Sequence, residues 1–130
     1  MINKKLDKNA KKIDNFLIKF LKKQKKTFLV APMKYGVISG GKKIRSTIIF
    51  DTGKLLKIKE KSLIDICAAV ECIHSYSLIH DDLPCMDNDS MRRGKPSTHK
   101  KFGESTAVLA GNSLLTLAFE IISNKKNSLS

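Results

Sequence analysis

Residues 62–89 read SLIDICAAVECIHSYSLIHDDLPCMDND and decide the fold of this chain. Up to His80 the apolar residues recur at the spacing of one helix face, so the sequence predicts a helix over 63–80 with Ser62 as its N-cap. Asp65 then lies near the positive end of the helix dipole. From residue 81 to residue 103 the sequence becomes polar and turn-rich. We therefore expect a core helix that ends in a cluster of carboxylates.

Helical spacing is also found on both sides of this stretch. Near the N-terminus apolar residues recur at helical spacing between lysines, which predicts an amphipathic helix that packs into the core. Further helices are expected over 28–39, entered near Pro32 and ended by Gly40 and Gly41, and over 44–56. The last helix is predicted over 104–123, and the tail 124–130 is expected to fray. Because no segment alternates like a strand, the predicted fold class is all-α.

Four carboxylates, those of Asp81, Asp82, Asp87 and Asp89, lie within nine residues. Such a cluster is costly unless water or cations neutralise it, and hard oxygen ligands favour Mg²⁺. On a straight helix Asp81 and Asp87 would point about 240° apart. Pro84 must bulge or break the helix, and taking two residues out of the helical count leaves about 40° between these two side chains. The spacing therefore predicts a two-carboxylate Mg²⁺ site at Asp81 and Asp87.

Cationic residues stand on both sides of the predicted core helix. Arg92 and Arg93 follow the carboxylates, and they are either counter-charges to them or a clamp for diphosphate oxygens, which suit the guanidinium fork. Upstream, residues 40–45 read GGKKIR, a glycine turn with Lys42 and Arg45 at a helix start, where backbone amides also attract phosphate. Together with the other two elements, this turn predicts a second anion site.

Two further residues of the predicted core helix face the carboxylates. His74 lies seven residues before Asp81 on the same helix face, which favours a polar substrate contact over a structural role. Tyr76 lies about one and a half turns before Asp81. Its ring is either a core residue or the closure of an apolar channel below the metals, and the sequence leaves both interpretations open.

The chain carries 25 Lys and Arg against 12 Asp and Glu, a formal net charge of +13. This excess suits an anionic partner, which is nucleic acid, an acidic membrane surface or a phosphorylated substrate. Only three of the cations are arginines, the residue that reads nucleic acid by bidentate contacts, so no nucleic-acid partner is expected. The lysine-rich N-terminus is interpreted as a solvated helix face.

Cys67, Cys72 and Cys85 form no Cys-x-x-Cys pair, which is typical of reduced thiols in a cytosolic protein. The N-terminus has no apolar core of a signal peptide, and no stretch is long and apolar enough without charges to predict a membrane span. We therefore expect a cytoplasmic protein.

Six motifs occur in a fixed order: GGKKIR at 40–45, AAVECIHSYSLIH at 68–80, DDLPCMD at 81–87, RRGKPSTH at 92–99, KFGE at 101–104 and LAGNSLL at 109–115. In this order and spacing they resemble the trans-isoprenyl diphosphate synthase family (polyprenyl synthetases), most closely its bacterial members that make farnesyl diphosphate. The resemblance implies a helical bundle. It also implies that residues 31–123 are the N-terminal half of the synthase domain, preceded by a basic amphipathic helix within 1–30 and followed by the tail 124–130.

The resemblance implies a role for each residue of the predicted site. Asp81 and Asp87 match the Mg²⁺ ligands of the first Asp-rich motif, and Asp82 matches a catalytic carboxylate that supports them. Arg92 matches the residue that holds the allylic diphosphate, and Tyr76 occupies the position that sets chain length. The residues matching those that hold isopentenyl diphosphate are Lys42, Arg45, His74 and Arg93.

In this family, Mg²⁺ and the cations draw charge off an allylic diphosphate (dimethylallyl or geranyl diphosphate) until the diphosphate leaves. The double bond of isopentenyl diphosphate captures the carbocation, and a proton is lost. The expected product is farnesyl diphosphate. Geranylgeranyl diphosphate is the alternative, because plant-type synthases share DDLPCMDND, which spans residues 81–89 here. A homodimer is expected for the full-length protein.

The chain also departs from the family pattern. Ser46 replaces a usual proline, and Ser90 and Asn112 replace usual aspartates. Family members are much longer, and their remaining part carries the second Asp-rich motif, further lysines and the rest of the bundle. We therefore expect a truncated synthase that is inactive or nearly so alone. The alternatives are a non-catalytic subunit that works by assembly and a basic module that binds nucleic acid or membrane.

Overall fold

The structure, a computed structural model, describes residues 1–124. Over these residues the chain is helical apart from one small hairpin, so the predicted all-α class is confirmed. The elements, in chain order, are α1 (Ile2–Lys23), α2 (Val30–Val37), α3 (Ile44–Leu55), α4 (Glu60–Asp81), β1 (Met91–Arg92), β2 (Lys95–Pro96), α5 (Thr98–Phe102) and α6 (Glu104–Ser123). The predicted fraying of residues 125–130 lies outside the described residues.

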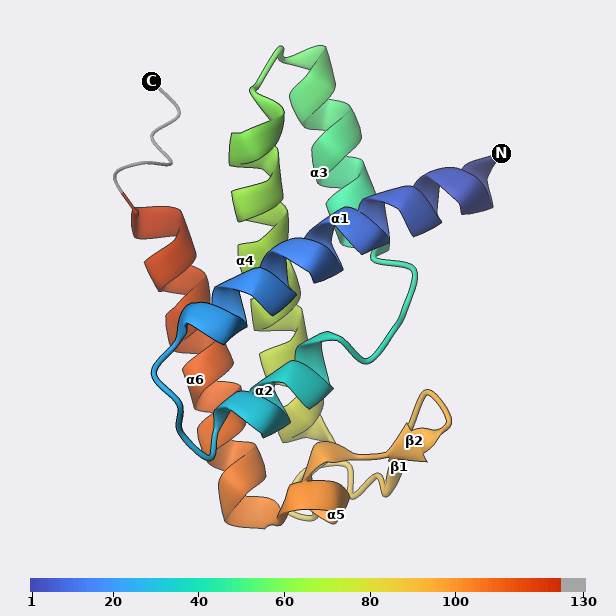
Figure 1. Cartoon of the computed structure of the whole chain (residues 1–130). Coiled ribbons are helices and arrows are strands. Elements are labelled where there is room, and N and C mark those ends of the chain that lie inside the picture. The colour runs from blue at the N-terminus through green and yellow to red at the C-terminus, as the bar shows by residue number, and fades with distance from the viewer. Residues whose placement is uncertain (125–130) are drawn as a thin grey trace.

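The helices α4 and α6 lie side by side, with α4 in the middle of the bundle and α6 at its edge (Figure 1). Small buried residues line both helices, including Ala68 and Ala69 on α4 and Ala107 and Ala110 on α6. Such residues let two helix axes come close, because they add little side-chain bulk between them. This packing fixes the position of the C-terminal end of α4, where the carboxylate cluster begins.

The helix α1 crosses the face of the bundle diagonally, against α3 and α4 (Figure 1). Its buried residues Leu6, Ile13, Leu17 and Leu21 recur at helical spacing, and most of the lysines between them are exposed. The predicted amphipathic helix with its apolar face in the core is therefore confirmed. The helix ends at Lys23, before the N-terminal segment of residues 1–30 is complete.

The start of α4 differs from the prediction. The helix begins at Glu60 with Lys59 as its N-cap residue, so Ser62 lies inside the first turn and the predicted Ser62 cap is wrong. Lys59 has an extended backbone and so ends the preceding turn itself, while Glu60 places a negative charge in the first turn. Asp65 is 5% exposed, Oδ2 has no hydrogen-bond partner among the described residues, and burial raises the pKa of this carboxyl.

The turn-rich region after α4 contains more structure than the sequence pattern indicates. The strands β1 and β2 pair antiparallel, with Met91 opposite Pro96 and Arg92 opposite Lys95, and α5 follows directly. Strands of two residues are too short for any alternation to be visible in the sequence. The hairpin lies beside the C-terminal end of α4 and below α2 in the view of Figure 1.

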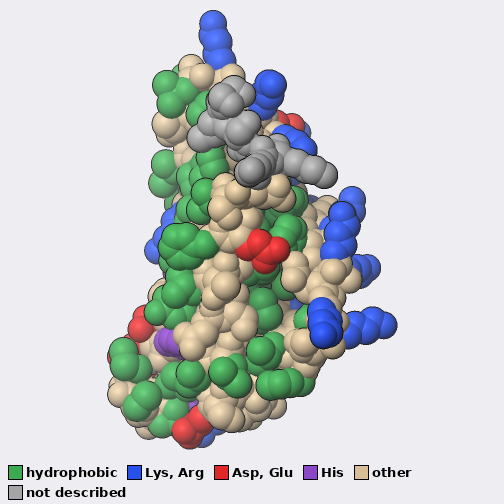
Figure 2. All heavy atoms as spheres, turned by 90° about the vertical axis from the view of Figure 1, so that its left-hand side faces the viewer, with side chains coloured by type: hydrophobic (Ala, Val, Ile, Leu, Met, Phe, Trp, Pro, Cys, Tyr) green, Lys and Arg blue, Asp and Glu red, His purple; other side chains and the backbone are tan. Residues whose placement is uncertain are grey.

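Hydrophobic side chains gather on the outer face of α6 (Figure 2), where Leu109, Phe119 and Ile122 are each at least 45% exposed. By length and composition alone, α4 and α6 are apolar enough to cross a membrane, with mean hydropathies of 1.4 and 1.5. They pack against each other, as core helices of a bundle do. The expectation of no membrane span stays a prediction.

The three cysteines are free, as the sequence predicted. Cys67 and Cys72 are buried in the core, and burial raises the pKa of each thiol to about 12. Both thiols therefore stay protonated and inert at neutral pH. Cys85 is exposed in the loop after α4.

Candidate diphosphate-binding site

The turn between α2 and α3 adopts backbone angles that favour glycine. Gly40 and Gly41 have φ values of 87° and 95°, and Lys43, the residue before α3, has a φ of 44°. Only glycine adopts such angles without steric cost, which explains the Gly-Gly pair. The turn delivers Lys42 and Arg45 to the start of α3, where the sequence placed an anion site.

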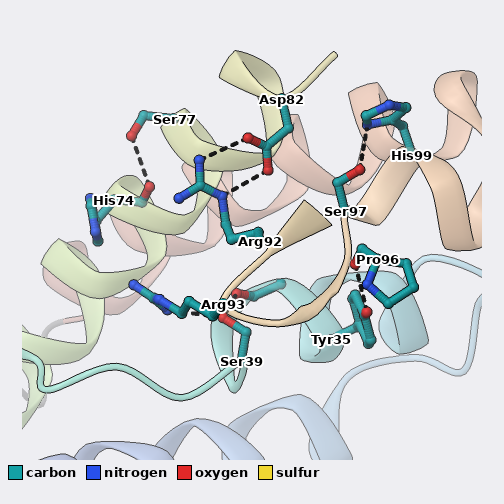
Figure 3. Close-up of polar contacts among 11 residues, drawn as sticks. Tyr35, Ser39, His74, Ser77, Asp82, Arg92, Arg93, Pro96, Ser97 and His99 are labelled. Carbon is teal, nitrogen blue, oxygen red and sulfur yellow. Dashed lines mark hydrogen bonds and ion pairs between the residues drawn. The ribbon is translucent and has the colours of Figure 1, made fainter. Parts of the chain in front are cut away.

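Arg93 connects this turn to the hairpin, across more than fifty residues of sequence. Its Nη1 donates to Ser39 Oγ at 3.1 Å and to the carbonyl oxygen of Gly40 at 2.9 Å (Figure 3). A Cβ atom on Gly41 would lie 2.9 Å from Arg93 Cζ, so the second glycine leaves room for the guanidinium. The glycine turn and the arginine hairpin therefore form one structural unit.

The four residues predicted to hold isopentenyl diphosphate come together in this unit. They line one cleft of about 140 Å³, and they come from the turn, α3, α4 and the hairpin. Lys42, Arg45 and Arg93 are exposed, and His74 is half-buried. Three exposed cations, with buried Lys43 beside them, make this small cleft a place where an anion is favoured. The four residues predicted to hold isopentenyl diphosphate that line this cleft are Lys42, Arg45, His74 and Arg93.

The surroundings of His74 in this cleft lower the pKa of its imidazole. Its Nε2 lies 3.4 Å from Arg45 Nη1. Burial lowers the pKa of the imidazole, and the adjacent positive charge of Arg45 lowers it further. The ring is therefore neutral at pH 7, and Nε2 accepts a hydrogen bond from Arg45. His74 orients this guanidinium without adding a charge.

Glu71 also lines the cleft, although no sequence pattern points to it. Its Oε1 accepts a hydrogen bond of 2.6 Å from Ser46 Oγ, and both residues are buried. The bond joins α3 to α4 directly behind the cleft. In the sequence, the only indication of this contact is Ser46 itself. It stands where the family pattern has a proline, which could not donate this hydrogen bond.

The carboxylate cluster is arranged differently from the prediction. The helix α4 ends at Asp81, and the chain turns through Pro84 without resuming the helix. The backbone N–H of Asp87 donates to the carbonyl oxygen of Asp81 at 2.8 Å. A break near Pro84 is confirmed, but the idea that helical periodicity aligns the two aspartates is wrong. A loop closed by a backbone hydrogen bond brings Asp81 and Asp87 together instead.

Asp82 points away from this loop and holds Arg92. The carboxylate is 2% exposed and receives Arg92 Nε at 2.7 Å and Nη2 at 2.8 Å (Figure 3). The hydrogen bond to Asp82 raises the pKa of Arg92 above its ordinary value. Each oxygen of Asp82 accepts a hydrogen bond from Arg92, so this buried carboxylate positions an arginine.

Asp81 and Asp87 fit a Mg²⁺ ion by the chemistry of their oxygen donors. Mg²⁺ keeps several waters and needs only one or two protein carboxylates when a substrate phosphate completes its shell. Asp81 is half-buried and Asp87 is exposed, so both remain open to solvent and ligand. No group of three or more His, Cys, Asp or Glu side chains within residues 1–124 is placed to hold a metal.

An apolar pocket of about 350 Å³ opens beside Asp81. Tyr76 lines it, and the ring of Tyr76 packs edge-on against that of His80 with centroids 4.7 Å apart. His80 Nε2 lies 3.0 Å from the carbonyl oxygen of Val108 on α6. Tyr76 both lines this pocket and packs against the hydrophobic core, so both interpretations from the sequence remain open.

Comparison with known proteins gives a consistent result. The family model described as polyprenyl synthetase matches residues 26–130. Farnesyl diphosphate synthase from Buchnera aphidicola (subspecies Acyrthosiphon pisum) is 58% identical over 99 residues, 76% of this chain and 35% of that protein. The enzyme of the same name from Escherichia coli is 52% identical over 75% of this chain and 33% of its own length. The chain thus spans about a third of the length of these relatives.

Solved structures share the fold. An FPP/GFPP synthase from Zymomonas mobilis superposes with a TM-score of 0.92 at 41% identity, over 98% of this chain and 46% of that one. A geranyltranstransferase from Thermotoga maritima gives a TM-score of 0.86 at 40% identity, over 91% of this chain and 44% of that one. The fold is that of an isoprenoid-synthase helical bundle. The chain belongs to the polyprenyl synthetase family.

Proposed function

We propose that this chain supplies the isopentenyl diphosphate cleft and the first half of the allylic diphosphate site of a prenyltransferase. The observation that carries the proposal is the meeting of Lys42, Arg45, His74 and Arg93 in one cleft. Four different elements contribute these residues, so their meeting is a property of the folded chain. Helical packing alone would not require three cations around an open cleft.

The cleft acts on a diphosphate by charge and orientation. Lys42 and Arg45 offer donors from the start of α3, and Arg93 offers the guanidinium nitrogens that do not hold the glycine turn. Neutral His74 keeps Arg45 aimed into the cleft. Because these donors are held before the ligand arrives, little reorganisation is needed on binding.

Asp81 and Asp87 would hold Mg²⁺ in the neighbouring half-site. When bound, the ion supplies Lewis-acid chemistry that stabilises the negative charge on a departing diphosphate. Arg92 adds a cation on the same side, with Nε and Nη2 fixed by Asp82. In this half-site the protein holds the leaving group and provides fixed positive charge.

The apolar pocket beside Asp81 would receive the hydrocarbon tail of the allylic substrate, dimethylallyl or geranyl diphosphate. The Tyr76 ring limits this pocket, which supports farnesyl diphosphate as the product. The alternative product is geranylgeranyl diphosphate, and one observation favours it. Geranylgeranyl pyrophosphate synthase 4 of Arabidopsis thaliana is 53% identical to this chain over 88 residues.

The chain alone would be inactive or nearly so, since it spans about a third of the relatives. The exposed apolar face of α6 supports the need for further protein surface. We further propose a homodimer for the full-length protein. The three free thiols support a cytoplasmic location.

Titration calorimetry with isopentenyl diphosphate tests the cleft. We expect binding to weaken about tenfold or more in Arg45→Met, as expected for loss of a charge-assisted contact. The matched control is Lys54→Met, which removes an exposed cation from the other end of α3 and should leave affinity unchanged. Equal effects of the two variants, or no binding by the unaltered chain, would reject the cleft.

A turnover assay tests the second part of the proposal. Purified chain is incubated with geranyl diphosphate, isopentenyl diphosphate and Mg²⁺, and no product is expected. Robust turnover that disappears in Asp81→Ala would disprove inactivity while supporting the prenyltransferase class. Turnover restored by adding a separately expressed C-terminal part of a homologous synthase would support the role as a partial site.

A further inference from the structure

Lys43 also lines the cleft, but unlike Lys42 and Arg45 its side chain is buried and its ammonium pairs with an acid of α1. Lys42 and Arg45 are exposed, whereas the Lys43 side chain is only 4% exposed. Its Nζ lies 3.2 Å from Asp14 Oδ1 on α1 and 3.5 Å from the carbonyl oxygen of Val37. The buried cation therefore links the glycine turn to the N-terminal helix.

The position of Lys43 carries two energetic costs. Its backbone is left-handed, with φ 44° and ψ 51°, where a residue with a Cβ atom is strained. A lysine ammonium taken out of water is also unfavourable unless an opposite charge compensates it. Among the described residues, Asp14 is the one acid in ion-pair contact with Nζ. The charge of this turn residue is therefore compensated by a residue of α1.

We propose that Asp14 and Lys43 are positioning residues for diphosphate binding. Their ion pair, called the clasp below, fixes the turn that aims Lys42 and Arg45 into the cleft. The inference rests on the proposed function and adds α1 to the site. Residue 14 lies outside the family-matched range of 26–130, so the clasp connects the N-terminal helix to the matched part of the chain.

Loss of Asp14 would act through the turn. The ammonium of Lys43 would lose its compensating charge and leave the bundle interior for water. The left-handed backbone would then relax, because the buried side chain no longer holds it. Lys42 directly precedes Lys43 and Arg45 follows two residues later, so both would lose their common orientation.

The first test is titration calorimetry with inorganic diphosphate on Asp14→Asn. By charge alone, removing an acid near an anion cleft raises anion affinity, whereas the clasp predicts about a tenfold loss. Glu60→Gln is the matched control. It makes the same charge change and breaks a different ion pair of α1, that of Lys12 with Glu60 at the start of α4, far from the cleft. Affinity for Asp14→Asn equal to or above that of Glu60→Gln would overturn the inference.

The second test needs no ligand. Hydrogen–deuterium exchange at the amides of residues 40–47 should accelerate at least tenfold in Asp14→Asn, stay unchanged in Glu60→Gln and recover in Asp14→Glu. Unchanged exchange in Asp14→Asn would overturn the clasp. If the unaltered chain fails to bind diphosphate but exchange responds as expected, the proposed function fails and the clasp stands.

Discussion

Asp82 and Arg92 are joined by two parallel hydrogen bonds, from Nε at 2.7 Å and from Nη2 at 2.8 Å. Asp82 follows the last residue of α4, and Arg92 lies in β1. The pair therefore anchors the hairpin to the end of the central helix. Because Arg93 follows Arg92 directly, the same anchor sets where Arg93 meets the glycine turn.

The change Asp82→Asn should destabilise the protein by about 1–3 kcal/mol, because it removes a charge-assisted pair with a buried acceptor. Partial exposure of the Arg92 side chain, 31%, keeps the loss below that of a fully buried pair. Urea denaturation measures the free energy of unfolding. Asp81→Asn is the control, since it makes the same change one residue earlier, where no ion pair is formed among the described residues. An equal loss of stability in Asp81→Asn would contradict the prediction.

The change Gly41→Ala should weaken diphosphate binding more than Gly40→Ala does. Both positions have a left-handed backbone, so both variants share a backbone strain of about 1–2 kcal/mol. Only at Gly41 would the added Cβ approach Arg93 Cζ to 2.9 Å, whereas the space around Gly40 is open. We expect a further tenfold loss of affinity, about 1.4 kcal/mol, by titration calorimetry. Equal affinities of Gly41→Ala and Gly40→Ala would show that a Cβ atom at residue 41 does not disturb Arg93.

The stability of the protein should fall at mildly acidic pH through His74. Burial, followed by the charge of Arg45, lowers the pKa of this imidazole in the folded state. An unfolded histidine binds its proton near pH 6.5, while the folded one resists it. The contribution is therefore fully present above pH 6.5 and is lost as pH falls from 6.5 through the lower folded pKa. Urea denaturation at pH 8 and pH 5 should show His74→Gln gaining stability relative to the unaltered protein at pH 5. A constant difference between the two proteins would refute this assignment.

The change Gly111→Ala should destabilise the contact between α4 and α6. A Cβ atom at this position would lie 2.3 Å from His80 Nε2, which must then move away from Val108 and Tyr76. Overpacking of this kind costs about 1–3 kcal/mol, more than the helix propensity that alanine gains over glycine. Thermal denaturation measures the loss. In a His80→Ala background the same substitution should cost little, and an undiminished loss there would place the clash elsewhere.

Helix positions were predictable from local pattern. The helix predicted over 104–123 is α6, because apolar spacing continues up to its end and Gly103 interrupts it at the start. The predicted start of α4 was wrong by three residues, because Ser62 is a common N-cap residue but Lys59 already has the extended backbone that precedes the helix. The hairpin was missed because strands of two residues leave no periodic signal.

The residues that line the cleft were predictable by residue type, but the residues that hold them in place were not. Lys42, Arg45, His74 and Arg93 carry charge or titrate, and they lie in motifs whose joint order and spacing pointed to them. Ser39, Glu71 and Asp14 act through contacts with residues 25 to 54 positions away. No local pattern marks such a partner, because the distance between the two side chains depends on how three or four helices pack.

The carboxylate run of residues 81–89 shows most clearly what the sequence determined and what the tertiary structure decided. By itself the sequence determined that Pro84 ends the helix near His80 and that several acids follow, because a proline lacks the N–H that a helix needs. Only the tertiary structure decided what each acid does. Asp82 turns inward to Arg92, while a backbone hydrogen bond brings Asp87 back to Asp81. The reason is physical: a buried carboxylate must find a donor, and the donor comes from a hairpin whose position depends on the packing of the whole bundle.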